Sequence, residues 1–482
     1  MKLIVGRTQE KEILYKATQS ERSELIAVYG RRRVGKTFLI RSYFNKDFTF
    51  KVTGIANASL QQQLANFNFA LQSVHPKLDF TLAKDWIESF QQLTSIILKS
   101  RKKKKIIFID ELPWFDTANS KFVQALEHFW NSFASARNDI ILIICGSAAS
   151  WMLNKIINNH GGLHNRVTKR IKLEPFTLNE CQQLLSTKHI QLDQYQIARL
   201  YIAIGGIPFY WEEVEAGLSA DQNIQEICFS PNGLLKNEFN NLFPSLFSNS
   251  DKHLTIVKTL SKKAKGLSRN EIIKLSGLTN AGSTTRIFNE LEESGFIRKY
   301  TPFSKKRRQS LYQLTDFYTL FYLKFIENTP KDNTNYWINS FDSPKYRAWS
   351  GYAFELLSLL HVDQIKNTLG ISGIETAIYS WRSKTSEQGS QIDLLIDRKD
   401  QVINLCEMKF SIGEFSISKS YARNLRNKAS TFKEETKTRK SVMITFVSTF
   451  GLKDNEHSIG LIQKHITLED LFLPHSNNRH AR

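Results

Sequence analysis

The fold of this chain is decided by the stretch Leu25-Ile-Ala-Val-Tyr-Gly30-Arg-Arg-Arg-Val-Gly35-Lys36-Thr37. It opens with a short apolar run of the length expected for a buried strand. The run is followed by the spacing GxxxxGK[ST], and residues 38–44 then have the character of a helix. Strand, glycine loop and helix in this order predict a phosphate-binding loop. The alternative is a glycine turn that contains Lys-Thr by chance, and the flanking strand and helix disfavour it.

Each part of this loop has a physical task. Gly30 and Gly35 allow the backbone to curl so that successive N–H groups point at phosphate oxygens, and the helix N-terminus adds partial positive charge. Lys36 can then reach the β- and γ-phosphates, and the Thr37 hydroxyl can bind Mg²⁺. We therefore expect ATP and Mg²⁺ as cofactors. The predicted nucleotide contacts are Gly30, Arg31, Arg32, Arg33, Val34, Gly35, Lys36, Thr37 and Phe38.

A second buried-strand run supplies the acidic partner that such a loop needs. Ile106-Ile-Phe-Ile is followed by Asp110-Glu111, so two carboxylates stand where a strand ends. We expect Asp110 to bind Mg²⁺ and Glu111 to act as the general base that polarises the attacking water. An Asp-Glu pair at a strand end is a weak signal by itself, but downstream of a phosphate-binding loop it is a strong one.

Two further polar residues are candidates for the same site. Ser147 follows the apolar run 140–145 and is either a sensor of the γ-phosphate or water, or the N-cap of a helix over 148–158. Arg166 precedes a predicted strand at 169–173 and is a candidate arginine finger, acting within the chain or on a neighbouring subunit. The alternative for Arg166 is a solvated surface position.

Three segments together resemble the archaeal-type ATPases, which are AAA+-like P-loop NTPases grouped with the STAND signalling ATPases. The segments are Gly6-Arg7-Thr-Gln-Glu10, the loop Gly30–Thr37 and Phe108-Ile-Asp-Glu-Leu-Pro-Trp114. The resemblance covers essentially the whole chain, and its most specific motifs lie within residues 1–210.

This resemblance implies further roles. Gly6 and Arg7 are expected to lie beside the adenine, and Gly205-Gly-Ile-Pro208 is expected to be the element with which a helical lid senses the nucleotide. From the residues alone, the second segment is more simply a helix stop. Ser147 stands where AAA+ proteins commonly have Asn, which implies slow hydrolysis.

The charge balance points to a polyanionic partner. Lys and Arg number 66 against 46 Asp and Glu, a formal net charge of +20. Such an excess suits nucleic acid or an anionic membrane surface, whereas a Lys-rich host proteome would produce it without a partner.

The four cysteines include no CxxC pair, which argues against a zinc clip or a disulfide framework. The first residues do not resemble a signal peptide and no apolar run approaches a membrane span, so we expect a cytoplasmic protein without a membrane partner.

The middle of the chain has apolar residues at helical spacing. Apolar spacing over 177–247 predicts a helical lid. Three short helices and a hairpin around Lys305-Lys-Arg-Arg308 follow, and this order predicts a winged helix-turn-helix. We expect its basic wing to contact DNA, and the alternative is a packing or protein-contact module. The candidate recognition residues are Thr284, Thr285, Arg286 and Asn289.

A second candidate active site lies in the C-terminal region. Residues 391–410 predict a β-hairpin that brings Asp393 near Glu407 and Lys409, which share one strand face. Two such carboxylates can bind Mg²⁺, and the lysine can orient or deprotonate a water. The pattern D-x13-E-x-K resembles the PD-(D/E)xK nuclease superfamily, which implies Glu355 as a further, helical acid. The alternative is a solvent-facing hairpin with a Glu–Lys pair.

These inferences combine into an α/β fold with five segments: a P-loop NTPase core with a parallel sheet (1–175), a helical lid (176–247), a winged helix-turn-helix (248–326), a linker (327–345) and an α/β restriction-endonuclease-like domain (346–482). A basic stretch at 419–440 suits a flank that tracks a nucleic-acid backbone. One hypothesis is a Mg²⁺-dependent ATPase that couples nucleotide state to DNA binding and to DNA cleavage. The other is a nucleotide-dependent DNA- or protein-binding switch whose nuclease-like domain is inert. A homo-oligomer is compatible with both.

Overall fold

The computed structural model describes most of the chain. The described residues are 3–76, 81–157, 163, 165–247, 249–329, 335–340, 342–383 and 390–474, with the side chain of Arg307 left out. Part of the predicted linker, 330–334 and 341, therefore lies outside the described residues. The chain divides into two compact units, Met1–Pro175 with Leu246–Ser248 and Phe176–Ser245 with Asn249–Arg482.

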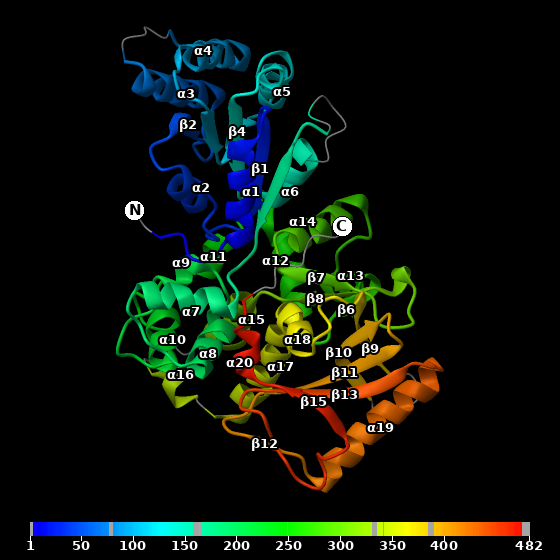
Figure 1. Ribbon diagram of the computed structural model, residues 1–482. Coiled ribbons are helices and arrows are strands. Elements are labelled where there is room, and N and C mark those ends of the chain that lie inside the picture. The colour runs from blue at the N-terminus through cyan, green and yellow to red at the C-terminus, as the bar shows by residue number, and fades with distance from the viewer. Residues whose placement is uncertain are drawn as a thin grey trace. The chain divides into compact units, whose positions relative to one another are not determined.

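A five-stranded parallel sheet forms the centre of the first unit (Figure 1). Its strands are β1 Glu24–Gly30, β2 Phe48–Thr53, β3 Lys105–Asp110, β4 Ile140–Gly146 and β5 Lys169–Leu173. They stand in the order β2-β3-β4-β1-β5, and every neighbouring pair runs parallel. β1 and β4 are buried along their whole length, as expected for a parallel sheet covered on both faces. The sheet confirms the predicted α/β fold of this unit.

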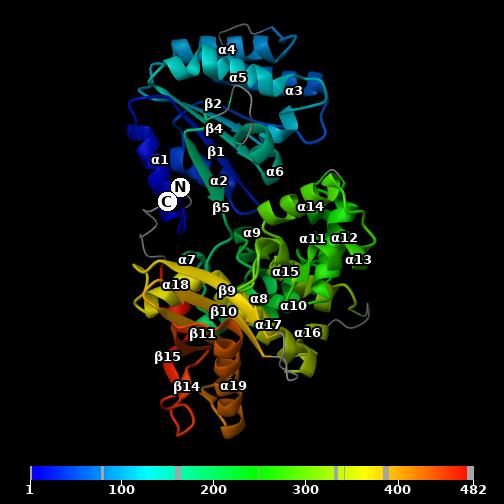
Figure 2. The same cartoon turned by 90° about the vertical axis from the view of Figure 1, so that its right-hand side faces the viewer.

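Helices cover both faces of this sheet. They are α1 Thr8–Gln19, α2 Lys36–Phe44, α3 Leu60–Val74, α4 Trp86–Lys99, α5 Phe122–Ser132 and the short α6 Ala149–Trp151. Figure 2 shows α3, α4 and α5 together on one side of the sheet, and α1 and α2 on the other. Beneath α3–α5 the rings of Trp86 and Phe122 are 4.9 Å apart, and those of Phe50 and Phe67 are 5.0 Å apart. Such edge and tilted ring contacts add to the free energy of apolar burial.

The second unit begins with a group of helices. They are α7 Leu178–Thr187, α8 Gln194–Ile204, α9 Pro208–Trp211, α10 Ala220–Cys228 and α11 Glu238–Leu242. α7 begins with a capping box, in which Thr177 and Glu180 satisfy each other's backbone donors. The helices that the apolar spacing predicts are therefore present in this segment.

Three helices and a small antiparallel sheet follow. The helices are α12 Ser250–Ser261, α13 Arg269–Ser276 and α14 Gly282–Glu293, and the strands are β6 Leu267–Ser268, β7 Ile297–Tyr300 and β8 Leu311–Leu314, in the order β6-β8-β7. Ser268 and Glu271 form the expected capping box at the start of α13. α15 Phe317–Phe321 then joins this segment to α16 Tyr336–Asn339. One predicted recognition residue, Thr284, is buried, and its hydroxyl donates to the Thr279 carbonyl oxygen at 2.6 Å. Thr284 was therefore assigned to the wrong face of its helix.

A mixed sheet forms the C-terminal part of the second unit. α17 Pro344–Leu360 and α18 Val362–Thr368 precede its strands β9 Thr376–Arg382, β10 Gln391–Arg398, β11 Val402–Lys409, β13 Ser441–Ser448 and β15 Ile462–Ile466. The strand order is β15-β13-β11-β10-β9, antiparallel from β9 to β11 and parallel from β11 to β15. The predicted hairpin is thus present as β10 and β11. The remaining elements are β12 Phe415–Ser416, α19 Lys419–Thr436, β14 Leu452–Lys453 and α20 Leu468–Leu471.

α19 packs along one face of this sheet. Phe432 of α19 joins Trp381, Leu395 and Leu405 in one apolar cluster, and Leu425 joins Phe446 in a second. The opposite face of α19 is polar and exposed, because its apolar residues Ala422, Leu425 and Phe432 recur at helical spacing on one side. In the part of the chain that the structure describes, no helix has the length and apolarity needed to cross a bilayer.

Candidate functional site

Two glycines shape the loop between β1 and α2. Gly30 has φ +141° and Gly35 has φ +92°, a region in which side chains cause strain. A Cβ atom on Gly30 would lie 2.4 Å from the carbonyl oxygen of Leu173 on β5. Glycine is needed at position 30 because the backbone of β5 leaves no room for a side chain. The loop is therefore held against the sheet at its first residue.

The ammonium group of Lys36 is turned into this loop. Its Nζ donates hydrogen bonds to the carbonyl oxygens of Gly30 at 3.0 Å and Arg31 at 2.9 Å, and the residue is 6% exposed. Burial lowers the pKa of Lys36, and the carboxylates at the end of β3 oppose that shift only in part. A buried cation that is compensated mainly by carbonyl dipoles favours an anion at the same place.

The other loop residues differ in what they expose. Val34 and Arg31 are buried, whereas Arg32 and Phe38 are exposed and Arg33 is half-buried with φ +68°. Arg32 and Phe38 therefore offer their side chains to solvent at the mouth of the loop, while Val34 takes part through its backbone.

The two predicted magnesium ligands lie in contact. The hydroxyl of Thr37, in the first turn of α2, donates to Oδ2 of Asp110 at 2.8 Å. Asp110 ends β3 and is 2% exposed, and its Oδ1 accepts the backbone N–H of Glu111 at 3.0 Å. The guanidinium of Arg41 lies farther away, 3.9 Å from Oδ2. The pairing of a hydroxyl with a carboxylate puts two oxygen ligands of the kind Mg²⁺ prefers side by side.

Glu111 is held by the predicted sensor residue. The hydroxyl of Ser147 donates to Oε2 of Glu111 at 2.8 Å. Glu111 has φ +49°, a left-handed conformation that is uncommon for a residue with a side chain and is often found at functional sites. The N-cap of α6 is Ala148, whose side chain makes no capping hydrogen bond, so the interpretation of Ser147 as the N-cap is wrong. Ser147 instead joins the end of β4 to the end of β3.

The predicted adenine-side residues lie next to the loop. Arg7 is buried, and its guanidinium donates to the carbonyl oxygens of Val34 at 3.0 Å and Glu174 at 2.8 Å. Gly6 precedes it with φ +58°. Arg7 therefore ties the beginning of α1 to the phosphate-binding loop and to the residue that follows β5.

Two other predicted residues lie in other segments of the chain. Arg166 lies in an exposed turn before β5. Pro208 begins α9 in the second unit, and Gly205, which has φ +69°, is the C-cap of α8. A Cβ atom on Gly206 would lie 2.0 Å from the carbonyl oxygen of Phe176, so this glycine is fixed by packing. The local role of this segment is the helix stop that the residues alone favour.

The C-terminal acids have two sets of polar partners, although the pairing of Leu394 with Cys406 sets Asp393 opposite Glu407 on neighbouring strands. In the first, Nζ of Lys265 lies 2.7 Å from Oδ1 of Asp393 and 3.0 Å from Oε2 of Glu355. Gln391 also donates to Oδ1 of Asp393 at 2.7 Å. Burial and the charge of Asp393 raise the pKa of Glu355 to about 7, although Lys265 acts in the opposite direction. Lys265 comes from the connection between α12 and β6, and no sequence pattern pointed to it.

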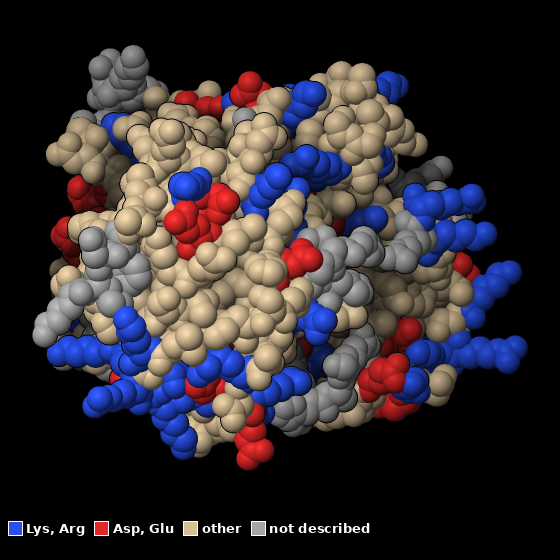
Figure 3. Space-filling view, turned by 90° about the horizontal axis from the view of Figure 1, so that it is seen from above, with Lys and Arg blue, Asp and Glu red and all other residues tan. Residues whose placement is uncertain are grey.

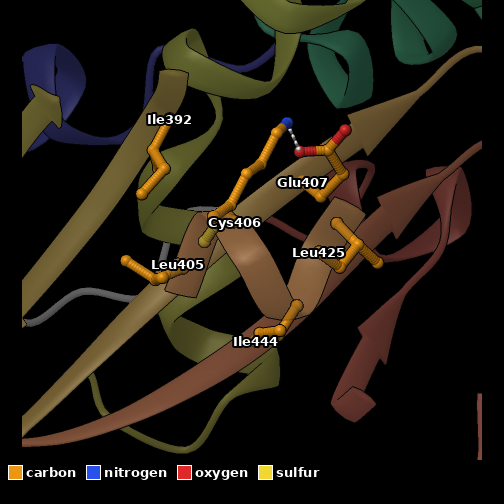
Figure 4. A pocket seen from close by; sticks show the side chains of 7 residues that line it. Ile392, Leu405, Cys406, Glu407, Leu425 and Ile444 are labelled. Carbon is orange, nitrogen blue, oxygen red and sulfur yellow. Dashed lines mark hydrogen bonds and ion pairs between the residues drawn. The ribbon is translucent and has the colours of Figure 1, made fainter. Parts of the chain in front are cut away.

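The second set of partners surrounds Glu407. Its carboxylate accepts hydrogen bonds from Tyr421 and, at 2.8 Å, from Lys428, both on α19, and Lys409 lies 3.6 Å away. Although burial raises it, the charges of Lys428 and Lys409 hold the pKa of Glu407 below its usual range. Figure 4 shows Glu407 and this ion pair at the edge of a small cavity whose other walls are mainly apolar. These walls are Ile392, Leu405, Cys406, Leu425 and Ile444.

The two regions differ in how well they suit a metal ion. At the loop, Thr37 and Asp110 fit Mg²⁺, which in such sites takes one or two protein oxygens and completes its shell with phosphate and water. In the C-terminal sheet, ammonium groups already lie against Asp393, Glu355 and Glu407. Across the described ranges, with their gaps, no three or more His, Cys, Asp or Glu side chains are grouped to hold a metal ion. The C-terminal residues, as they are arranged, do not fit one.

Comparison with known proteins identifies relatives of the first unit and part of the second. Residues 4–214 match the model of an ATPase domain predominantly from Archaea. An uncharacterized protein of Methanocaldococcus jannaschii is 24% identical over 67% of this chain and 69% of its own. The Walker-type ATPase of Pyrococcus abyssi has a similar fold, with a TM-score of 0.50 and 15% identity over 67% of this chain and 96% of its own. The ORC2 protein of Aeropyrum pernix gives a TM-score of 0.41 at 12% identity, over 67% of this chain and 92% of its own.

Proposed function

We propose that the first unit binds ATP with Mg²⁺ and hydrolyses it, because residues 4–214 match the model of an ATPase domain predominantly from Archaea. The observation that carries the proposal is a pair of contacts at neighbouring strand ends. Thr37 meets Asp110, and Ser147 meets Glu111, both at 2.8 Å and both beside the glycine loop. Each contact joins a residue that an ATPase needs for metal or water to a second residue that holds it in place.

Each residue has one task in this proposal. The backbone N–H groups between Gly30 and Thr37 hold the phosphates, and Lys36 turns outward from its two carbonyl partners to bind the β- and γ-oxygens. Thr37 and Asp110 hold Mg²⁺, which supplies neutralisation of phosphate charge. Glu111 accepts the proton of the attacking water, and Ser147 fixes the direction of its carboxylate.

The experiment that tests nucleotide binding uses Lys36→Ala. We expect the affinity for ATP, measured by titration calorimetry with Mg²⁺, to fall by about 10- to 100-fold, because a charge-assisted hydrogen bond contributes roughly 1.5–3 kcal/mol. Lys51→Ala is the matched control, since Lys51 is an exposed lysine of the same unit on β2. Undiminished ATP turnover by the Lys36 variant would contradict the proposed role of the loop.

We also propose that α12–α14 with the β7–β8 hairpin form a winged helix-turn-helix that binds DNA together with α19. Phe303, in the hairpin loop, packs against Phe432 of α19 with 5.4 Å between ring centroids, and its N–H donates to the Ser380 carbonyl oxygen at 2.7 Å. The basic hairpin and the basic helix are therefore held together. Their exposed cations, which we call the basic flank, are Lys299, Lys306, Arg308, Lys419, Arg423, Arg426, Lys433, Lys437 and Arg439.

The basic flank omits one arginine that the sequence alone would include. Arg298 donates to Oε1 of Gln313 at 2.8 Å and lies 4.8 Å from the centre of the Tyr300 ring. Its guanidinium therefore makes contacts within the protein. On the recognition helix, Thr285, Arg286 and Asn289 remain exposed. Lys and Arg side chains also project from the rim of the face drawn in Figure 3.

DNA binding is tested by its salt dependence. With Arg423→Glu and Arg426→Glu, duplex affinity should fall, and the log–log slope against salt should become shallower by about 0.9 for each phosphate that the protein no longer neutralises. Lys103→Glu is the control, because Lys103 is an exposed lysine in the first unit, outside the basic flank. A wild-type affinity that does not change with salt would refute DNA binding through this surface.

Of the two hypotheses for the C-terminal domain, the arrangement favours the inert one. Hydrolysis of DNA by two carboxylates requires oxygen ligands that a metal ion can reach. Asp393 and Glu407 instead each lie against an ammonium group. We therefore propose that the chain is a nucleotide-dependent DNA-binding switch, in which the nuclease-like sheet acts as a scaffold.

A further inference from the structure

Lys265 occupies a defined position between two carboxylates of the C-terminal sheet. Its ammonium lies 2.7 Å from Asp393 on β10 and 3.0 Å from Glu355 on α17, although 128 and 90 residues separate it from them in the chain. Both carboxylates are about three-quarters buried, at 23% and 24% side-chain exposure. Two acids this close repel each other unless a cation lies between them. Lys265 provides that cation from the protein itself.

The backbone around Lys265 is fixed on both sides. The Tyr300 hydroxyl on β7 donates to the carbonyl oxygen of Lys265 at 2.6 Å, and the Gln313 side chain on β8 donates to that of Ala264 at 2.8 Å. Gly266 follows with φ +79°, and a Cβ there would lie 2.6 Å from the carbonyl oxygen of Tyr312. Hydrogen bonds from the small sheet β6-β8-β7 thus fix the backbone at Lys265, and this backbone directs the side chain toward the two carboxylates.

The same small sheet also contacts α17. The amide of Gln313 lies 3.4 Å from the hydroxyl of Tyr352, which stands one helical turn before Glu355. Arg298 donates to the other end of the Gln313 amide at 2.8 Å. The hairpin that we place in the DNA-binding surface is therefore connected, through Gln313 and Lys265, to the two carboxylates.

We propose that Lys265 is an internal counter-ion that keeps divalent cations from the Asp393–Glu355 pair. A divalent ion needs the oxygens that Lys265 occupies, and the two cations repel each other at this distance. The side chain of Lys265 is 40% exposed, so its two ion pairs are moderate in strength. The charge of Lys265 therefore decides whether the Asp393–Glu355 pair is available to a divalent ion.

Mn²⁺ binding to the full chain, without nucleotide or DNA, tests the proposal. Lys265→Met keeps the length of the side chain and removes its charge, and we expect it to bind Mn²⁺ at least about tenfold more tightly than the wild type. Adding Asp393→Asn should abolish the gain, and Lys265→Arg should behave as the wild type. Lys262→Ala is the matched control, because it removes an exposed charge a few residues away.

Two results would overturn the proposal. One is equal Mn²⁺ affinity in the wild type and the Lys265→Met chain, and the other is a gain that survives Asp393→Asn. Lys265→Gln, measured beside Lys265→Met with thermal unfolding of both, separates loss of the fold from loss of the counter-ion. Because the titration uses neither ATP nor DNA, its outcome is independent of the proposed ATPase and DNA-binding functions.

Discussion

The two acidic regions of this chain hold their carboxylates in opposite ways. At the end of β3, Asp110 and Glu111 are held by the neutral hydroxyls of Thr37 and Ser147. In the C-terminal sheet, Asp393 and Glu407 are held by the ammonium groups of Lys265 and Lys428. A hydroxyl orients a carboxylate and leaves its charge available to a cation, whereas an ammonium neutralises that charge. Carboxylates at strand ends therefore indicate chemistry only together with their partners.

The largest effect is expected when the charge of Glu111 is removed. Glu111→Gln keeps the shape of the side chain and should retain ATP affinity, while turnover should fall by about 10²- to 10⁴-fold, the usual contribution of a general base. Steady-state ATP hydrolysis and ATP titration measure the two quantities. Glu407→Gln is the companion variant, and its ATP turnover should equal that of the wild type. A similar loss in both would erase the distinction between the two regions.

A smaller effect is expected from the hydroxyl that orients Glu111. Ser147→Ala removes the 2.8 Å hydrogen bond and leaves the charge of the carboxylate in place. Turnover should fall by about tenfold with little change in ATP affinity, because a misdirected base still carries its charge. Ser147→Thr, which keeps a hydroxyl, should recover much of the rate. If Ser147→Ala alters ATP affinity and leaves the turnover number unchanged, Ser147 is not a positioning residue for the base.

The smallest effect concerns stability alone. Tyr421→Phe removes the hydroxyl that donates to Glu407, and we expect the free energy of unfolding to fall by about 1–2 kcal/mol, because a buried charged acceptor loses one donor. Denaturant unfolding measures this change, and ATP turnover should stay the same. An increase in stability would mean that Lys428 and Lys409 satisfy the carboxylate without the tyrosine.

Short sequence segments predicted which residues meet in the first unit. Gly30 to Thr37 and Asp110-Glu111 each follow an apolar strand, and a parallel sheet brings such strand ends together. The role of Ser147 stayed open between two alternatives, since only the position of β4 beside β3 decides it. Thr284 was misplaced because a small error in helix phase moves a side chain to another face.

Lys265 shows what a single sequence does not reveal. Nothing in the spacing of residues 262–268 distinguishes this lysine from Lys262 or Lys263, which are exposed. Its role depends on the meeting of three elements that are far apart in the chain. The D-x13-E-x-K pattern described the hairpin correctly, and the partners of its acids came from α19 and from the α12–β6 connection.

The close approach of Gly30 to Leu173 has a mechanical consequence. The first residue of the glycine loop lies directly against the last residue of β5, and Arg7 fastens the loop to the next residue, Glu174. The chain crosses into the second unit immediately afterwards. A displacement of the loop at Gly30 must therefore displace Leu173 and Glu174 as well, because no space separates the two backbones.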